Sequence, residues 1–146
     1  MSDAQTHLMI NHLPLTLPII GVIILIIALV INSRVSRRIG YFIIVLSGMF
    51  TVPVFFSGEG AEHFVEELGR SHDLIHEHEE SAEIYAYLSY LISLFSLFAL
   101  YMSWKKKALE RILLPMVLVG ALALSYLSFE TGRSGGKISH PEVSKD

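Results

Sequence analysis

The chain has 146 residues, of which 52% are hydrophobic and 17% are charged, and its formal net charge is −3. Its mean hydropathy of +0.53 is too high for an ordinary soluble domain of this size, so residues 1–146 are expected to form one membrane domain. The chain has no cysteine, which excludes disulfides, iron–sulfur clusters, covalently attached c-type haem and thiol catalysis.

Four segments have the length and composition of membrane-crossing helices. A helix needs about 20 mostly apolar residues to cross the hydrocarbon core of a bilayer. Segments that meet or approach this requirement lie at about residues 13–31, 39–56, 84–104 and 112–129. They predict an all-α integral membrane protein, folded as an antiparallel bundle of four transmembrane helices, with a polar segment at 1–12 before the first span.

The long polar connection at 57–83 is expected to form a helical outer loop. Gly58 and Gly60 are expected to break the helix of the second span. Residues 61–68 then read as a short amphipathic helix that ends at Gly69. The pattern therefore predicts a helix break close to the outer end of the second span.

The helix of the third span is expected to begin well before the apolar segment. Ser71 is suited to the N-cap position, and no helix-breaking residue follows it before Trp104. At about 1.5 Å per residue, this helix should project about three turns beyond the membrane. The polar tail at 130–146 contains a Gly-Gly pair at 135–136, which predicts a non-helical segment after the fourth span.

The charged residues are distributed unevenly over the loops. The two short loops, which connect the first span to the second and the third to the fourth, carry seven basic residues and one acidic residue, Glu110. The termini and the long connection carry four basic and thirteen acidic residues. Because basic residues in short loops mark the cytoplasmic side, both termini are expected to face outward.

All seven histidines of the chain then fall on the outer, acidic side. His12, His78 and His140 come from three separate regions of the chain, and each is close to the end of a span. Packing of neighbouring helices would bring these three regions together, so the histidines are candidates for one site at the outer face.

His72 and His76 have a simpler interpretation. At about 100° per residue, they share a helix face with Glu79, Glu80 and Glu83. A histidine pair four residues apart on a helix can chelate a metal ion. A solvated acidic face is the preferred interpretation, because charged helix faces usually contact water.

His78 is predicted to point into the bundle, because it lies about 200° from His76 around the helix. The residues that continue its face are Ala82, Tyr85, Ser89, Ser93 and Ser96. The matching stripe on the fourth span is Ala121, Ser125 and Ser128. Small residues mark the faces on which membrane helices pack. An inward ionisable group there is a candidate functional residue, and the alternative is a structural histidine bonded to Glu130, Glu59 or a carbonyl group.

Taken singly, His12 reads as a helix-cap residue and His140 as an exposed residue of the tail. Taken with His78, they form a candidate three-histidine centre. The carboxylates that could complete such a centre, as ligands or as outer-shell partners, are Glu59, Glu62, Glu130 and Glu142.

The same pieces of sequence carry a resemblance to a known family. They are Asn-His-Leu-Pro at 11–14, Ser-Gly-Glu-Gly-Ala-Glu at 57–62, His-Glu-Glu-Ser-Ala at 78–82, and Gly-Gly-Lys-Ile-Ser-His-Pro-Glu at 135–142. The chain resembles, over about residues 7–142, the four-helix bacterial membrane family catalogued as domain of unknown function 2231.

This resemblance implies a location in the bacterial inner or plasma membrane and favours His12, His78 and His140 as the site residues. Members of that family resemble redox components, and some are joined to Rieske or cytochrome c domains. The resemblance therefore implies a role near respiratory electron transfer. Residues 1–146 include no such domain and no cysteine, so any redox centre is expected to be bound non-covalently or supplied by a partner.

Three functions are considered, and the preferred one is a subunit that binds a cofactor or metal at a histidine centre on the outer face, in a respiratory electron-transfer context. Two of the histidines could ligate a b-type haem axially. Three histidines and a carboxylate would also suit zinc, copper or iron, and the acidic outer side would concentrate cations. The third function is a non-catalytic scaffold or accessory subunit in which the histidines form a structural polar clasp. The expected partners are the lipid bilayer and other membrane redox subunits or cytochromes, whereas hydrolytic catalysis and nucleic-acid binding fit the sequence poorly.

Overall fold

The computed structural model describes residues 2–140, apart from the side chains at positions 3 and 59. Its helices are α1 (Asp3–Ile10), α2 (His12–Val30), α3 (Arg34–Glu67), α4 (His72–Trp104) and α5 (Glu110–Ser139). No strand occurs in residues 2–140, so the predicted all-α class is confirmed.

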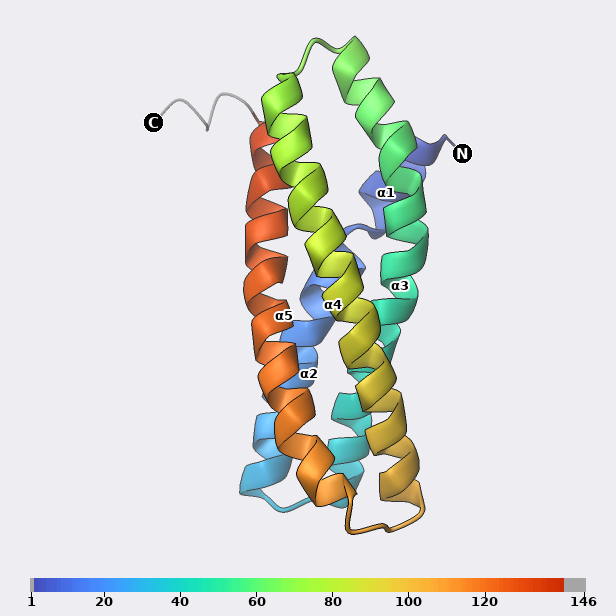
Figure 1. Ribbon diagram of the computed structural model, residues 1–146, viewed down its shortest axis with the longest axis vertical. Helices are drawn as coiled ribbons and strands as arrows, with labels where there is room; N and C mark the ends of the chain where they lie inside the picture. The colour runs from blue at the N-terminus through green and yellow to red at the C-terminus, as the bar shows by residue number, and fades with distance from the viewer. Residues whose placement is uncertain (1, 141–146) are drawn as a thin grey trace.

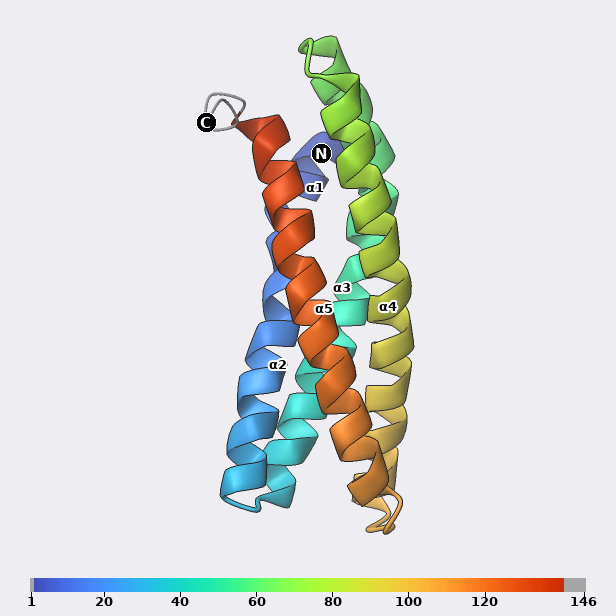
Figure 2. The same ribbon diagram turned by 60° about the vertical axis from the view of Figure 1, so that its left-hand side comes forward.

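The four long helices, α2 to α5, run alternately in opposite directions and lie side by side (Figures 1 and 2). One end of the assembly holds α1, the turn at 68–71 and the C-terminal end of α5, and we call it the histidine end. The other end holds the two short loops at 31–33 and 105–109, and we call it the basic end. Each of the four long helices therefore runs between the histidine end and the basic end.

The four long helices are long and apolar enough to cross a membrane. Large apolar side chains cover their outward faces: Leu94 is 65% exposed, Val119 is 66% exposed and Phe129 is 66% exposed. Exposed apolar surface on this scale is unusual for a protein surrounded by water. The arrangement is compatible with a membrane protein whose outward faces contact lipid.

The interior combines aliphatic side chains with small residues. Leu25, Ile44 and Val117 are fully buried in the core. Helices α3 and α4 approach very closely at Gly48, where an added Cβ atom would lie 2.6 Å from Cβ of Ser93 and would also collide with its Oγ. Only glycine fits this position without moving α4, so the small-residue stripe predicted on the third span is the surface on which α3 packs.

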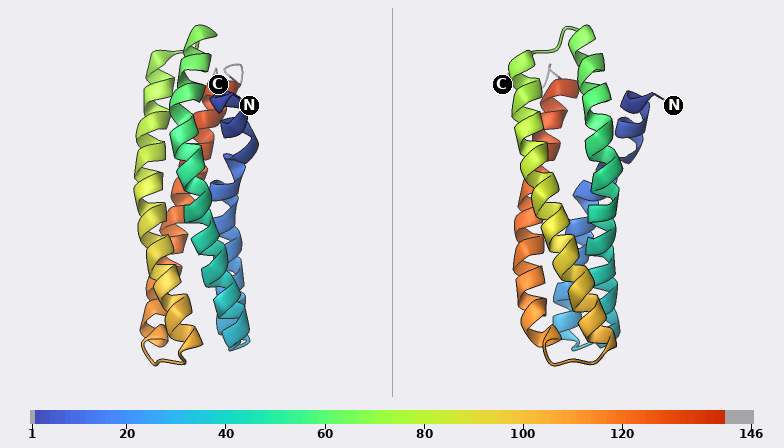
Figure 3. Two further views of the ribbon diagram at one scale, coloured as in Figure 1. Left: turned by 90° about the vertical axis from the view of Figure 1, so that its right-hand side faces the viewer. Right: turned by 45° about the vertical axis from the view of Figure 1, so that its right-hand side comes forward.

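Helix α1 lies within the N-terminal segment, which the sequence predicted only as polar. Ser2 caps it, and Ser2 and Gln5 form a reciprocal capping box. The short helix lies beside α3 at the histidine end (Figure 3). Asn11 then separates α1 from α2.

The predicted helix break at Gly58 and Gly60 is wrong, because α3 continues to Glu67. A glycine inside a helix costs about 1 kcal/mol relative to alanine, which packing and good helix-forming neighbours can offset. The predicted end at Gly69 is confirmed: this residue has a positive φ of 73°, and its N–H donates to the carbonyl of Glu66 at 2.8 Å. The expected loop at 57–83 is therefore two helix ends joined by a short turn.

The predicted non-helical tail is also wrong as far as Ser139, because α5 continues through Gly135 and Gly136. The reason is tertiary packing, since Ser134 and Ile138 on this part of the helix are buried. The predicted start of α4 after Ser71 is confirmed, although the Ser71 side chain makes no capping hydrogen bond. The remaining tail residues, 141–146, lie outside the described part of the chain.

Candidate functional site

His78 lies on the inward face of α4, as its helical position predicts. The residue is partly buried, and its Nδ1 atom is 2.9 Å from Oγ of Ser134 on α5. Gly135 leaves room for the ring, because a Cβ atom there would lie 3.1 Å from Cε1 of His78. The closest polar partner is thus a hydroxyl group rather than the carboxylate of Glu130, which the sequence suggested as one alternative.

The contact of His78 belongs to a row of polar contacts along the α4–α5 seam. Toward the core, Oγ of Ser81 is 2.8 Å from Oγ1 of Thr131. On the outer side, Nζ of Lys137 donates to Oε1 of Glu77 at 2.9 Å. We refer to three pairs as the α4–α5 clasp: Glu77–Lys137, His78–Ser134 and Ser81–Thr131.

A second histidine, which the sequence reasoning did not select, also points inward at this end. His7 on α1 is partly buried, and its Nδ1 atom is 3.1 Å from the carbonyl oxygen of Val54 and 3.3 Å from Oγ of Ser57. These contacts fasten α1 to α3. The capping pattern of Ser2 and Gln5 is the sequence signal that could have revealed this helix, and with it the orientation of His7.

The hydrogen bonds favour the same tautomer for both rings. A carbonyl oxygen only accepts, so Nδ1 of His7 donates to Val54. The Ser134 hydroxyl donates to the carbonyl of Thr131 at 3.0 Å, so its oxygen accepts from Nδ1 of His78. In each ring Nε2 then carries the lone pair, which is the arrangement found in histidines that ligate metals.

Both rings precede the apolar segments at 13–31 and 84–104, and His78 has acidic residues on either side in the sequence. Burial lowers the pKa of His78, and a charge on His7 lowers it further, whereas the backbone of Thr131 opposes this effect. Burial also lowers the pKa of His7, against a smaller opposing effect of the Val54 carbonyl. The two rings are therefore neutral at pH 7 and close enough to interact electrostatically.

Asn11 adds a further polar group at this end. Its Oδ1 atom is buried and has no hydrogen-bond partner among the described residues. A buried acceptor without a partner is costly, and such groups are usually satisfied by water, an ion or a ligand. This amide oxygen belongs to the Asn-His-Leu-Pro motif singled out in the sequence.

The other two members of the predicted three-histidine centre are placed differently. His12, the first residue of α2, and His140, just after α5, are both exposed. Glu62 and Glu130 are partly buried, whereas the side chain of Glu59 and all of Glu142 lie outside the description. Among the described side chains, no three histidine, aspartate or glutamate residues lie together in a group that could hold a metal ion.

The face that carries His72 and His76 is acidic and exposed, as the preferred interpretation held. The side chains of His72 and His76 are 81% and 65% exposed. His76 approaches Glu79 at 3.5 Å and Glu80 at 3.6 Å, and His72 approaches Glu66 at 3.3 Å. These are surface contacts of small energetic value.

A second polar layer lies deeper than His78. Tyr85 on α4 donates its hydroxyl to the carbonyl of Pro14 on α2, and Ser47 on α3 donates to the same carbonyl at 2.9 Å. Thr51 and Ser89 join α3 to α4 at 3.0 Å between their hydroxyl oxygens. Hydroxyl groups thus link neighbouring helices all the way from the histidine end into the core.

The basic end has a different kind of polar centre, which the sequence reasoning did not predict. Arg37 Nε donates to Oε1 of Glu110 at 2.7 Å, and the hydroxyl of Tyr41 donates to the same oxygen at 3.3 Å. Glu110 is only 4% exposed. Arg38 donates to Oγ of Ser103 at 3.2 Å and to its carbonyl at 2.8 Å, which ties α3 to α4.

A signal for this centre was present in the sequence. Glu110 is the single acid among the seven basic residues of the two short loops, and it begins a helix. An acid in such surroundings is expected to pair with one of the cations. Its partner could not be chosen from spacing alone, because Arg37 and Glu110 are far apart in the chain and meet only through the helix packing.

Comparison with known proteins gives no relative to set beside this geometry: no family model matches the chain, and no curated protein or solved structure matches it. The resemblance to the membrane family catalogued as domain of unknown function 2231 therefore stays a prediction that rests on its short motifs.

Proposed function

We propose that this protein is an integral membrane protein, a bundle of four transmembrane helices with the histidine end on the outer face. The apolar outward faces of the helices and the excess of basic residues in the two short loops support this topology. A chain without cysteine allows a direct test by labelling single-cysteine variants in intact cells. A membrane-impermeant maleimide should label Ser71→Cys, and should label Ala108→Cys only after permeabilisation; the reverse pattern would contradict the orientation.

Within that topology the protein acts as a non-catalytic accessory or scaffold subunit, and the histidine end is held closed by a polar clasp. The observation that carries this proposal is the α4–α5 clasp, in which His78 and Ser134 are bonded at 2.9 Å between two other polar pairs. A histidine bonded to a neighbouring helix on its own seam has a structural role without any ligand. The exposed acidic helix ends at 66–83 then offer a surface for partner subunits.

A second candidate function, a cofactor-binding or metal-binding subunit near respiratory electron transfer, has one observation in its favour. His7 and His78 both keep Nε2 available while an oxygen atom holds Nδ1. The donor chemistry suits a b-type haem or a zinc, copper or iron ion, with His12 and His140 as the other predicted ligands. A bound haem or redox metal would supply one-electron transfer, and the residues here would bind and orient it. Other membrane redox subunits or cytochromes would be the partners.

One experiment separates the two candidates. The visible absorption spectrum of the detergent-purified protein is recorded oxidised and dithionite-reduced, with elemental analysis of the same sample. The clasp proposal expects a colourless, metal-free and folded protein whose thermal midpoint falls in His78→Ala. A Soret band that sharpens on reduction and disappears in His78→Ala would overturn it in favour of haem. Stoichiometric zinc, copper or iron that is lost in the same variant would favour the metal site, and His76→Ala is the matched control.

A further inference from the structure

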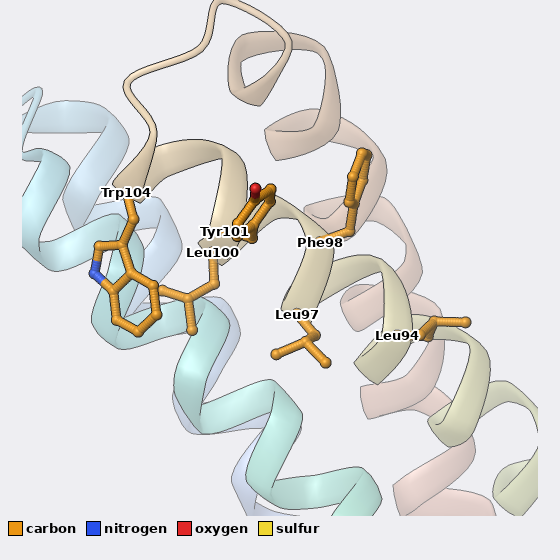
Figure 4. A pocket seen from close by; sticks show the side chains of 6 residues that line it. All are labelled: Leu94, Leu97, Phe98, Leu100, Tyr101 and Trp104. Atoms are coloured by element: carbon orange, nitrogen blue, oxygen red, sulfur yellow. The ribbon is translucent and has the colours of Figure 1, made fainter.

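A long apolar strip runs along the outward face of α4 toward the basic end. It includes a shallow cavity of about 360 Å³ with an almost entirely apolar lining, and a second hollow of about 260 Å³ adjoins it. Figure 4 shows the residues that line the first: Leu94, Leu97, Phe98, Leu100, Tyr101 and Trp104. At about 1.5 Å per residue the strip is about 15 Å long, which is half the thickness of a bilayer's hydrocarbon core and the depth of one leaflet.

The strip ends in aromatic residues and then in lysines. Tyr101 is 50% exposed and Trp104 is 62% exposed, and such residues favour the boundary between hydrocarbon and headgroups. Lys105, Lys106 and Lys107 follow directly and are all exposed. Nζ of Lys105 lies 5.8 Å from the ring centroid of Tyr101, so this lysine folds back over the end of the strip.

The positive charge at this point is not neutralised within the loop. Glu110 is the only acid among the basic residues of the two short loops, and it is buried against Arg37 at 2.7 Å. The three lysines therefore face the surroundings as an uncompensated cationic group. An apolar strip as long as one leaflet is deep, with exposed lysines at its end, is complementary to a lipid with a negatively charged headgroup.

The side chains of the strip also argue against a partner helix as the occupant. Membrane helices pack through small residues, which allow their backbones to approach closely. On α4 the small residues Ser89, Ser96 and Ser103 are fully buried inside the assembly. The outward strip instead carries leucine, phenylalanine and tryptophan, whose irregular surface suits flexible acyl chains.

We propose that this face of α4 binds an anionic phospholipid, with an acyl chain along the strip and the headgroup phosphate on Lys105, Lys106 and Lys107. The proposal rests on the membrane insertion proposed above and is independent of the chemistry at the histidine end. It also gives the basic end a ligand that would be retained when the protein is extracted from the membrane.

The proposal is tested by native mass spectrometry of the full chain in detergent, titrated separately with phosphatidylglycerol and phosphatidylcholine. We expect phosphatidylglycerol to bind about tenfold more tightly, because several lysines contact one anionic headgroup. The triple variant Lys105→Gln, Lys106→Gln, Lys107→Gln should lose this preference. Trp104→Ala should weaken the binding of both lipids.

The matched control removes three positive charges elsewhere: Arg34→Gln, Arg70→Gln and Arg133→Gln. It should keep the preference for phosphatidylglycerol. Equal binding of the two lipids, a preference that survives in the lysine variant, or an equal loss in the control would each overturn the lipid site. The cysteine-labelling pattern would be unaffected by any of these results, so failure of the lipid site is distinguishable from failure of the membrane topology.

Discussion

The helices are joined by different chemistry at the two ends of the molecule. At the basic end, a buried carboxylate, Glu110, accepts hydrogen bonds from Arg37 and Tyr41. At the histidine end, the buried groups are neutral, and the imidazole of His78 meets the hydroxyl of Ser134. A buried charge pair makes each partner depend strongly on the other, whereas a neutral hydrogen bond contributes about 1 kcal/mol. The difference predicts that separating the helices costs more free energy at the basic end than at the histidine end.

The largest effect is expected from breaking the buried pair. Glu110→Ala leaves the guanidinium of Arg37 without a counter-charge. Because the Arg37 side chain is only 12% exposed, water cannot fully replace the lost carboxylate. Loss of one partner of a buried ion pair typically costs about 3–5 kcal/mol. We expect a reduction of this size in the free energy of unfolding, measured by denaturant titration in detergent.

Two variants sharpen this first prediction. Replacing both partners by apolar residues, as in Arg37→Met with Glu110→Leu, should restore most of the stability, since no charge is left unpaired. Arg34→Ala, which removes an exposed arginine from the same helix end, should change the free energy of unfolding little. A small effect of Glu110→Ala would show that the pair is not buried in the folded protein, and the contrast between the two ends would then fail.

An intermediate effect is expected at the histidine end. His78→Ala removes the hydrogen bond to Ser134 and leaves a gap beside Gly135. We expect a loss of about 1–3 kcal/mol in the free energy of unfolding, the range for a partly buried polar side chain. Ser134→Ala should have a smaller effect in the same direction, and the exposed His76→Ala should have almost none. Equal effects of His78→Ala and His76→Ala would contradict the proposal that the α4–α5 clasp stabilises the protein.

The sequence predicted the inward face of His78 for a physical reason. Helical periodicity alone decides which side of a helix a residue occupies, and the small residues that follow His78 identified the packed side. The start of α4 after Ser71 and the helix end at Gly69 were predicted equally well, because both depend on local chemistry. All-helical structure with four long apolar helices followed from composition and length.

What the sequence could not predict depends on tertiary packing. Gly58, Gly60 and the pair at 135–136 are weak helix formers in isolation, yet α3 and α5 continue through them. His7 was overlooked because its helix is short and only its contacts with α3 orient it inward. His12 and His140 were expected to lie beside His78 because all three are close to span ends. Position along the chain does not determine which way each ring points.

The histidine end should lose stability in acid. Because the pKa of His78 is lowered in the folded protein, the unfolded chain binds a proton first as the pH falls. The contribution of His78 to the free energy of unfolding is therefore fully present above the ordinary histidine pKa of about 6.5, and it declines as the pH falls below that value. We expect the thermal midpoint to fall between about pH 7 and pH 5 with a slope that His78→Ala reduces. His76→Ala is the control, and an unchanged slope in His78→Ala would assign the acid response to other groups, His7 among them.

The smallest effect is expected from the outer pair of the clasp, Lys137 and Glu77. Their side chains are 29% and 55% exposed, so water and salt screen the contact even though the two atoms are 2.9 Å apart. Surface ion pairs contribute about 0.2–1 kcal/mol, and Lys137→Ala should lower the free energy of unfolding by no more than that. The loss should shrink further at high salt, whereas the loss in His78→Ala should not, because a neutral hydrogen bond is insensitive to ionic strength. A salt-dependent effect of His78→Ala would mean that a charged imidazole holds the histidine end, and the contrast between a neutral and a charged end would no longer stand.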